Sequence, residues 1–257
     1  MRNVNENELP EYEPWNYKFL FFLLVLPNLV ALIPLILYLP MGARSTGGTR
    51  YTCMNNLRII GYATYNYTSM SGGTLPISYT MDAEGNRLLS WRYSLLDLLN
   101  KFNIKQKINS EQTWDSAENL PFAATQILEF ACPDEDNYPN NGISYFTITG
   151  EETLFPDGSS VTLDQINAAD GTANTIMLTE AADMDIAWLE PRDIPFSNVN
   201  KPPREMLGTG PSSHHQEGFN VFYADGHAQE LSKDIDPIVL RALITWNGGE
   251  EITEEEF

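Results

Sequence analysis

The sequence has few residues of the kinds that build metal centres, and few basic residues. It contains two cysteines and three histidines, and Cys53 and Cys132 stand far apart instead of in a C-x-x-C pair. The sequence therefore shows no His and Cys cluster with the usual zinc-ligand spacing. Lys and Arg number 15 against 35 Asp and Glu, which gives a formal net charge of −20. Because a protein needs a basic face to bind phosphates, this balance argues against nucleic acid as a partner.

The acidic residues gather toward the two ends of the chain. Solvated, frayed termini explain such clusters, and a tail that docks on a basic partner is the alternative. We therefore delimit residues 1–18 as an acidic N-terminal tail and residues 250–257 as an acidic C-terminal tail. The residues that define the tails are Glu6, Glu8, Glu11, Glu13, Glu250, Glu251, Glu254, Glu255 and Glu256.

Sequence signatures of catalysis are also scarce. The chain has neither a G-x-S-x-G nucleophile elbow nor a Gly-rich phosphate loop. Ser212 and Ser213 adjoin His214, but adjacency alone does not make a nucleophile and its base. Residues 134–136 and 183–185 offer acidic ligands for calcium, yet neither group has EF-hand spacing, so we expect solvated loops. We predict no catalytic residue, no metal ligand and no cofactor, with calcium kept as an alternative.

The sequence does contain one long apolar run. Residues 19–41 read "FLFFLLVLPNLVALIPLILYLPM" without a charge, and about 20 apolar residues suffice to cross a bilayer as a helix. Trp15, Tyr17 and Tyr38 lie near its ends, where amphipathic rings favour the membrane interface. We therefore predict a single transmembrane helix over residues 19–41. Asn28, its one strongly polar side chain, would bond either its own helix backbone or a second membrane helix.

A cleaved signal peptide is the alternative interpretation of this run. "MGARS" at residues 41–45 resembles a small-residue cleavage site, but the run is long and the flank before it is acidic. The few basic residues on either side do not set an orientation. The two cysteines would form either two buried thiols or one disulfide, and a disulfide would place the C-terminal part outside the cytoplasm.

Residues 42–249 read as one α+β domain with long loops. Cys53, Leu57, Ile60 and Thr64 recur at helical spacing, so we expect an amphipathic helix over residues 47–70.

Two further helices have N-terminal capping signals. Ser90 would cap a helix that starts at Trp91, and Asp236 would cap a last helix with Pro237 at its first position. A short helix is expected within residues 116–130. The β-rich runs between these helices are residues 143–150, 160–166, 174–181, 219–226 and 227–232.

His215 is followed by nine residues and then by Asp225-Gly226. The Asp-Gly pair separates two β-rich runs and predicts a two-residue type I′ hairpin turn, in which both positions have positive φ. The extended strand between Gly218 and Asp225 would span about 20 Å. We therefore expect His215 and Asp225 at opposite ends of a strand, as parts of the scaffold and not as a catalytic pair.

Several ordered blocks of the chain resemble a bacterial family described as prepilin-type processing-associated, with a His-x9-Asp-Gly C-terminal signature. The resemblance spans roughly residues 50–249 and includes His215, Asp225 and Gly226, together with the Ser90-Trp91-Arg92 block. The other blocks are "CMNNLRIIGYATYNY", "FACPDED", "ITGEETLFPDG", "DGTANTIMLTEAAD", "WLEPRDIPF" and "DPIVLRALITWNGGE".

This resemblance implies a pilin-like protein, in which an N-terminal membrane helix carries an antiparallel β domain outside the cytoplasm. It carries no catalytic residue to this chain. With the domain outside the cytoplasm, Cys53 and Cys132 would form a disulfide that stabilises the fold by roughly 4 kcal/mol. The chain departs from the prepilin pattern at its processing site, because Leu23 stands where a prepilin has Glu. We therefore expect a retained anchor in the bacterial inner membrane.

Three functions follow as hypotheses. The first is a non-enzymatic envelope protein that contacts copies of itself or the subunits of a membrane complex. The second is an extracytoplasmic module that binds a glycan or calcium, for which a calcium-dependent melting shift would be the sign. The third is a hydrolase that uses His215.

Overall fold

The computed structural model describes residues 46–133 and 142–250, which belong to one unit of the chain, Ser45–Phe257. The predicted membrane run, residues 19–41 with Asn28, lies outside the described residues, as does the acidic N-terminal tail. None of the helices in the described ranges combines the length and the apolar character that a bilayer crossing requires.

A long helix, α3 (Thr46–Met70), opens the described part of the chain. Cys53, Leu57, Ile60 and Thr64 are each fully buried along one side of it. These are the positions that helical spacing selects, so the predicted amphipathic helix is confirmed.

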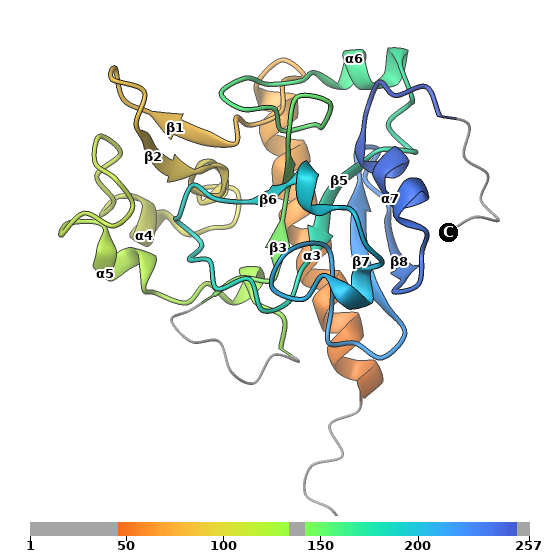
Figure 1. Cartoon of the computed structure of the whole chain (residues 1–257). Coiled ribbons are helices and arrows are strands. Elements are labelled where there is room, and N and C mark those ends of the chain that lie inside the picture. Colours follow the sequence, from red (N-terminus) through yellow and green to blue (C-terminus); the bar gives the residue numbers. More distant parts are fainter. Residues whose placement is uncertain (1–45, 134–141, 251–257) are drawn as a thin grey trace, which may run out of the picture. The chain divides into compact units, whose positions relative to one another are not determined.

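The main sheet has four antiparallel strands in the order β3-β5-β7-β8. They are β3 (Tyr145–Phe146), β5 (Ile176–Glu180), β7 (Gly218–Tyr223) and β8 (Ala228–Ser232). Every residue of β5 and β7 is buried, so both faces of the sheet must be covered. Figure 1 shows α3 crossing behind these strands and α7 (Pro237–Ile244) in front of them.

Helix α3 packs very closely on the sheet at one glycine. A Cβ atom built on Gly61 would lie 2.5 Å from ring atoms of Phe222 on β7. The ring of Tyr62 also meets Phe222 edge-on, with centroids 5.6 Å apart. Since a real Cβ does not approach a carbon atom this closely, the contact requires glycine at position 61.

Hydrogen bonds at helix N-termini explain why one predicted helix formed and one predicted strand did not. Helix α7 begins as predicted, with the Asp236 carboxylate accepting from the Ile238 N–H and Pro237 in the first turn. The predicted strand over residues 160–166 is wrong, because helix α6 (Leu163–Ala168) occupies that segment. Thr162 and Gln165 form a capping box there, which satisfies two N–H groups of a helix start.

The segment after Ser90 forms a 3₁₀ turn, η1 (Trp91–Leu95), in place of the predicted longer helix. Ser90 is its N-cap, as expected, and accepts from the Arg92 N–H. Turns follow η1, and Asn100 adopts a left-handed φ of 58° shortly before α4 begins at Phe102.

The remaining elements are short. Two of them, β4 (Ile148–Thr149) and β6 (Ile194–Pro195), pair in parallel, unlike the antiparallel arrangement expected throughout. The others are β1 (Tyr79–Met81), β2 (Arg87–Ser90), α4 (Phe102–Lys105), α5 (Leu120–Ala123), η2 (Leu128–Phe130), η4 (Phe196–Asn198) and η5 (Pro203–Glu205).

Candidate functional site

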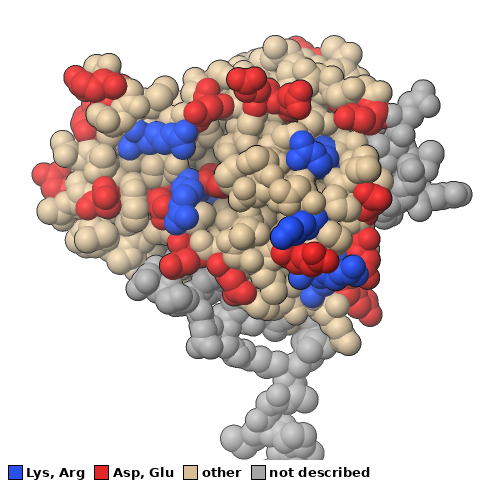
Figure 2. Space-filling model, in the orientation of Figure 1, with Lys and Arg blue, Asp and Glu red and all other residues tan. Residues whose placement is uncertain are grey.

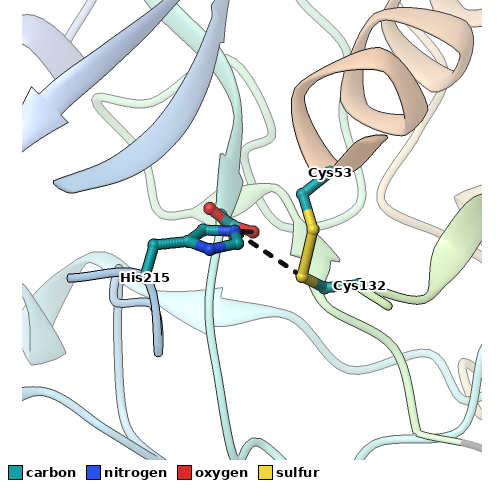
Figure 3. Close-up of side chains that lie close together, drawn as sticks. Cys53, Cys132 and His215 are labelled. Carbon is teal, nitrogen blue, oxygen red and sulfur yellow. Dashed lines mark hydrogen bonds and ion pairs between the residues drawn. A yellow bond between two sulfur atoms is a disulfide. The ribbon is translucent and has the colours of Figure 1, made fainter. Parts of the chain in front are cut away.

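A buried cluster joins the disulfide to His215. Cys53 on α3 is bonded to Cys132, which follows η2, so the disulfide that the family resemblance implied is confirmed. The ring of His215 faces this disulfide, with its Nε2 atom 3.7 Å from the Sγ atom of Cys132 (Figure 3). His215 Nε2 also lies 3.2 Å from Oε1 of Glu180, the last residue of β5. All four side chains are buried.

Asn220 on β7 holds the Glu180 carboxylate. Its backbone N–H and its side-chain amide both donate to Oε2 of Glu180, each at 3.0 Å. Oε1 of Glu180, the atom beside His215, accepts no hydrogen bond within the described part of the chain. The carboxylate is therefore fixed through one oxygen, while the other points into the cluster.

The two serines before His215 are used by the backbone. Ser212 Oγ donates to the Gly210 carbonyl and accepts from the Ala182 N–H. Ser213 Oγ accepts from the N–H of His215 at 3.1 Å. His214 turns outward instead, and its Nε2 lies 2.9 Å from Asp183. These contacts position the loop before β7 and do not form a nucleophile with a base.

Asp183 belongs to one of the two acidic groups considered for calcium. The contact with His214 occupies one of its carboxylate oxygens. The other group, residues 134–136, lies outside the described residues.

The Asp225-Gly226 end of the signature forms a hairpin loop of three residues. The Gly226 N–H donates to the Tyr223 carbonyl, and the Tyr223 N–H donates to the His227 carbonyl. Gly226 has a φ of 101°, whereas Asp225 is not among the residues with positive φ. The predicted type I′ turn is therefore wrong, since that turn needs positive φ at two positions.

The Asp225 carboxylate is satisfied at the hairpin tip. It accepts from the N–H of His227 at 3.0 Å and lies 2.6 Å from that residue's Nδ1 atom. The His227 ring stacks on Tyr223, and burial, together with nearby Asp225, raises the pKa of Tyr223 above its usual value. Asp225 follows β7, whereas His215 precedes it, so the two ends of the signature stabilise different parts of the fold.

A second buried cluster is built on the Ser90-Trp91-Arg92 block. Arg92 is fully buried, and its two Nη atoms bond both carboxylate oxygens of Asp193 at 2.6 and 3.3 Å. The Asp193 carboxylate also accepts from Trp91 Nε1 and from the Thr147 N–H, each at 3.0 Å. Ser90 Oγ accepts from Arg92 Nη1 at 2.8 Å. This network ties β2 and η1 to the start of β6.

Burial is the largest influence on the pKa values of Arg92 and Asp193. Burial raises the pKa of Asp193 and lowers the pKa of Arg92, while the attraction between the two groups opposes both shifts. Four donors reach the Asp193 carboxylate, so the network supplies the hydrogen bonds that a buried charge requires.

A shallow cleft opens near this pair, lined in part by Tyr79, Arg87, Asp157 and Arg192. Arg87 bonds Asp157 at 2.8 Å, and Arg192 bonds Glu190 at 2.6 Å. Burial, followed by a hydrogen bond to Asp157, raises the pKa of Tyr79. Both cations of the cleft thus already have an acidic partner, which leaves little attraction for an anionic substrate.

Sequence reasoning missed three members of these clusters: Glu180, Asp193 and Asn220. Glu180 and Asn220 lie inside mostly apolar runs, "TIMLTEA" and "FNVFY", whereas Asp193 stands beside Arg192 in "RDIPF". A buried polar residue needs a partner, so these runs contained a signal, but no spacing in the sequence identifies that partner.

Comparison with known proteins gives one family. Residues 49–167 match the model of a family described as "Protein of unknown function (DUF1559)". This match includes both cysteines and the Ser90-Trp91-Arg92 block, and it ends before His215. No curated protein and no solved structure matches the chain.

Proposed function

We propose that this protein is a non-enzymatic, pilin-like component of the bacterial envelope that acts through protein–protein contacts. Residues 19–41 would anchor it in the inner membrane, and residues 42–249 would lie on the outer side of that membrane. The Cys53–Cys132 disulfide supports this location, because such bonds persist outside the reducing cytosol.

The solvent-facing side of α3 is the observation that carries the proposal. Tyr51, Tyr62 and Tyr65 are exposed there, with exposed fractions of 68%, 53% and 37%. Their separations of 11 and 3 residues place them on the same side of a helix. Arg58 lies on this side too, and protein interfaces are enriched in Tyr and Arg and depleted of Lys, Asp and Glu, so this surface has the composition of a contact site.

The charge of α3 also differs from that of the rest of the chain. The helix contains no Asp or Glu, although the protein carries a net charge of −20. Figure 2, in the orientation of Figure 1 with α3 behind the strands, shows acidic side chains spread across the face in view, interspersed with Lys and Arg. A second acidic chain would therefore meet no acidic side chain of α3 itself.

We also propose that the chain belongs to the His-x9-Asp-Gly family. Under this proposal His215, Asp225 and Gly226 have structural roles, and so do Ser90, Trp91 and Arg92. Their hydrogen bonds within the two clusters and the hairpin support these roles.

Site-specific photo-cross-linking in the native membrane tests the contact surface. A photoreactive residue at Tyr51 or Asn55, both exposed on the outer side of α3, should capture protein upon irradiation. Ile238 on α7, which is 76% exposed, is the matched control and should capture much less. Equal capture from α3 and α7, or no capture from α3, would contradict the proposal.

A further inference from the structure

We propose that the reduced form of this chain binds one zinc ion through Cys53, Cys132, Glu180 and His215, and that formation of the disulfide closes this site. The ligand atoms of these four residues lie within 4.8 Å of one another, and all four residues are buried. Sequence spacing gave no zinc site because the ligands come from α3, the segment after η2, the end of β5 and the loop before β7. Only the folded chain brings them together.

The distances between the ligand atoms fit a tetrahedral ion. Zinc bonds of about 2.3 Å to sulfur and about 2.0–2.1 Å to nitrogen and oxygen imply S···N and N···O separations of about 3.6 and 3.4 Å. The corresponding distances are 3.7 Å from Cys132 Sγ to His215 Nε2 and 3.2 Å from that nitrogen to Glu180 Oε1. In the oxidised chain the two sulfur atoms are bonded to each other, so zinc can enter only after that bond is broken.

Glu180 provides an independent indication of a ligand. Its Oε1 atom is buried, points into the cluster and accepts no hydrogen bond from the described residues. Its near polar neighbour among the described residues is Nε2 of His215 at 3.2 Å, and one zinc ion would bind both atoms. Because Asn220 saturates Oε2, Oε1 is the oxygen left to bind the metal.

Neighbouring residues hold the ligands in the way that second-shell groups hold known metal ligands. Asn220 fixes Glu180, and Ser213 accepts from the backbone N–H of His215. The backbone N–H of Cys132 donates to Ser144 Oγ at 2.7 Å. Such support orients ligands before the metal arrives.

Two thiolates, one carboxylate and one neutral imidazole suit zinc better than they suit calcium or magnesium. Calcium and magnesium prefer oxygen ligands, whereas zinc takes sulfur and nitrogen in four-coordinate sites. Its sulfur ligands also distinguish this site from the calcium sites considered for the acidic residues 134–136 and 183–185.

The chemistry of the exchange balances with a dithiol as reductant. The dithiol transfers two electrons and two protons to the Cys53–Cys132 bond, which gives two cysteine thiols and leaves the reductant as a disulfide. Zinc then replaces the two thiol protons, which pass to solvent. In the reverse direction, the disulfide bond of an oxidant breaks as it accepts two electrons from the two thiolates and two protons from solvent, the Cys53–Cys132 bond forms again and zinc is released.

A surface groove borders the Cys132 side of this buried bond. Thr52, Asn56, Leu128 and Cys132 are among the residues that line it. Because Cys53 and Cys132 are both buried, a thiolate reaches the bond only when the chain around this groove opens.

Zinc titration of the full-length protein in detergent tests the site. The dithiol-reduced chain, freed of reductant without access to air, should retain one zinc per chain after gel filtration, and the oxidised chain should retain none. Zinc should also raise the thermal unfolding midpoint of the reduced chain, since binding to the folded state stabilises it. No zinc in the reduced chain, or equal zinc in both forms, would overturn the proposal.

The variant His215→Gln isolates the histidine ligand, and His227→Gln is its control because His227 lies at the hairpin tip away from the cysteines. Loss of a second-shell partner already weakens metal binding by about 10–100-fold, so His215→Gln should weaken it by at least that factor. Unchanged affinity in His215→Gln would contradict the assignment. If this variant does not fold, the double variant Cys53→Ser/Cys132→Ser provides the test. If zinc still raises the thermal unfolding midpoint of that variant, the proposed site is wrong. Neither readout depends on the proposed protein contacts.

Discussion

Arg92 is a fully buried cation whose charge depends on one carboxylate, that of Asp193. We predict that Arg92→Met lowers the free energy of unfolding by about 3–5 kcal/mol, because it leaves the Asp193 carboxylate buried without its counter-ion. Urea unfolding of the oxidised protein measures this change.

Arg87→Met is the matched control for this prediction. The Arg87–Asp157 pair is also formed, but its side chains are 49% and 65% exposed. Exposed pairs contribute about 1 kcal/mol or less, so this variant should stay close to the wild type. Equal decreases in the free energy of unfolding of Arg92→Met and Arg87→Met would contradict the prediction that the buried ion pair contributes more than the exposed one.

Single residues were predictable where their partners are close in sequence. Ser90 and Asp236 act as caps within two residues, and both were identified from local pattern alone. Glu180 and Asp193 were not identified, because their partners are brought to them from distant segments. Burial of a polar residue can be inferred from an apolar run, but its partner cannot.

Helix α3 packs closely on strand β7 where Gly61 meets Phe222. We predict that Gly61→Ala lowers the free energy of unfolding by roughly 1–3 kcal/mol, because the added methyl group would collide with the Phe222 ring. This loss should outweigh the gain of about 1 kcal/mol that alanine brings to a helix. Chemical unfolding measures the difference.

Asn55→Ala tests helix propensity alone, because Asn55 lies on the exposed side of the same helix. It should be neutral or slightly stabilising. The double variant Gly61→Ala/Phe222→Leu should recover part of the loss by making room for the methyl group. A Gly61→Ala protein more stable than the wild type would contradict the close packing of α3 on the sheet.

Whole elements were predictable where periodicity and caps agree. Helix α3, helix α7 and strands β5, β7 and β8 all follow predicted segments. Two predictions failed: a capping box starts helix α6 within residues 160–166, and turns follow the short η1 where a longer helix was expected. The hairpin was placed correctly, but its loop has three residues, because only Gly226 supplies positive φ.

The main sheet of the described part of the chain is antiparallel and is covered by α3 and α7. The disulfide and the Arg92–Asp193 network each join segments that are distant in sequence. The proposed function depends on the tyrosine-rich side of α3, which carries Arg58 but no acidic residue. The composition shows that the chain is acidic. The folded structure is needed to show which side of α3 faces solvent.

The native mass of the full-length protein, extracted gently from its own membrane in mild detergent, tests the central claim most directly. At physiological ionic strength, where repulsion between acidic chains is screened over about 8 Å, we predict a particle larger than one chain. Its other components would be copies of this protein or different subunits. Replacing Tyr51 and Tyr65 by serine should shift the particle toward the single chain. A single chain in the wild-type extract would contradict a function based on protein contacts.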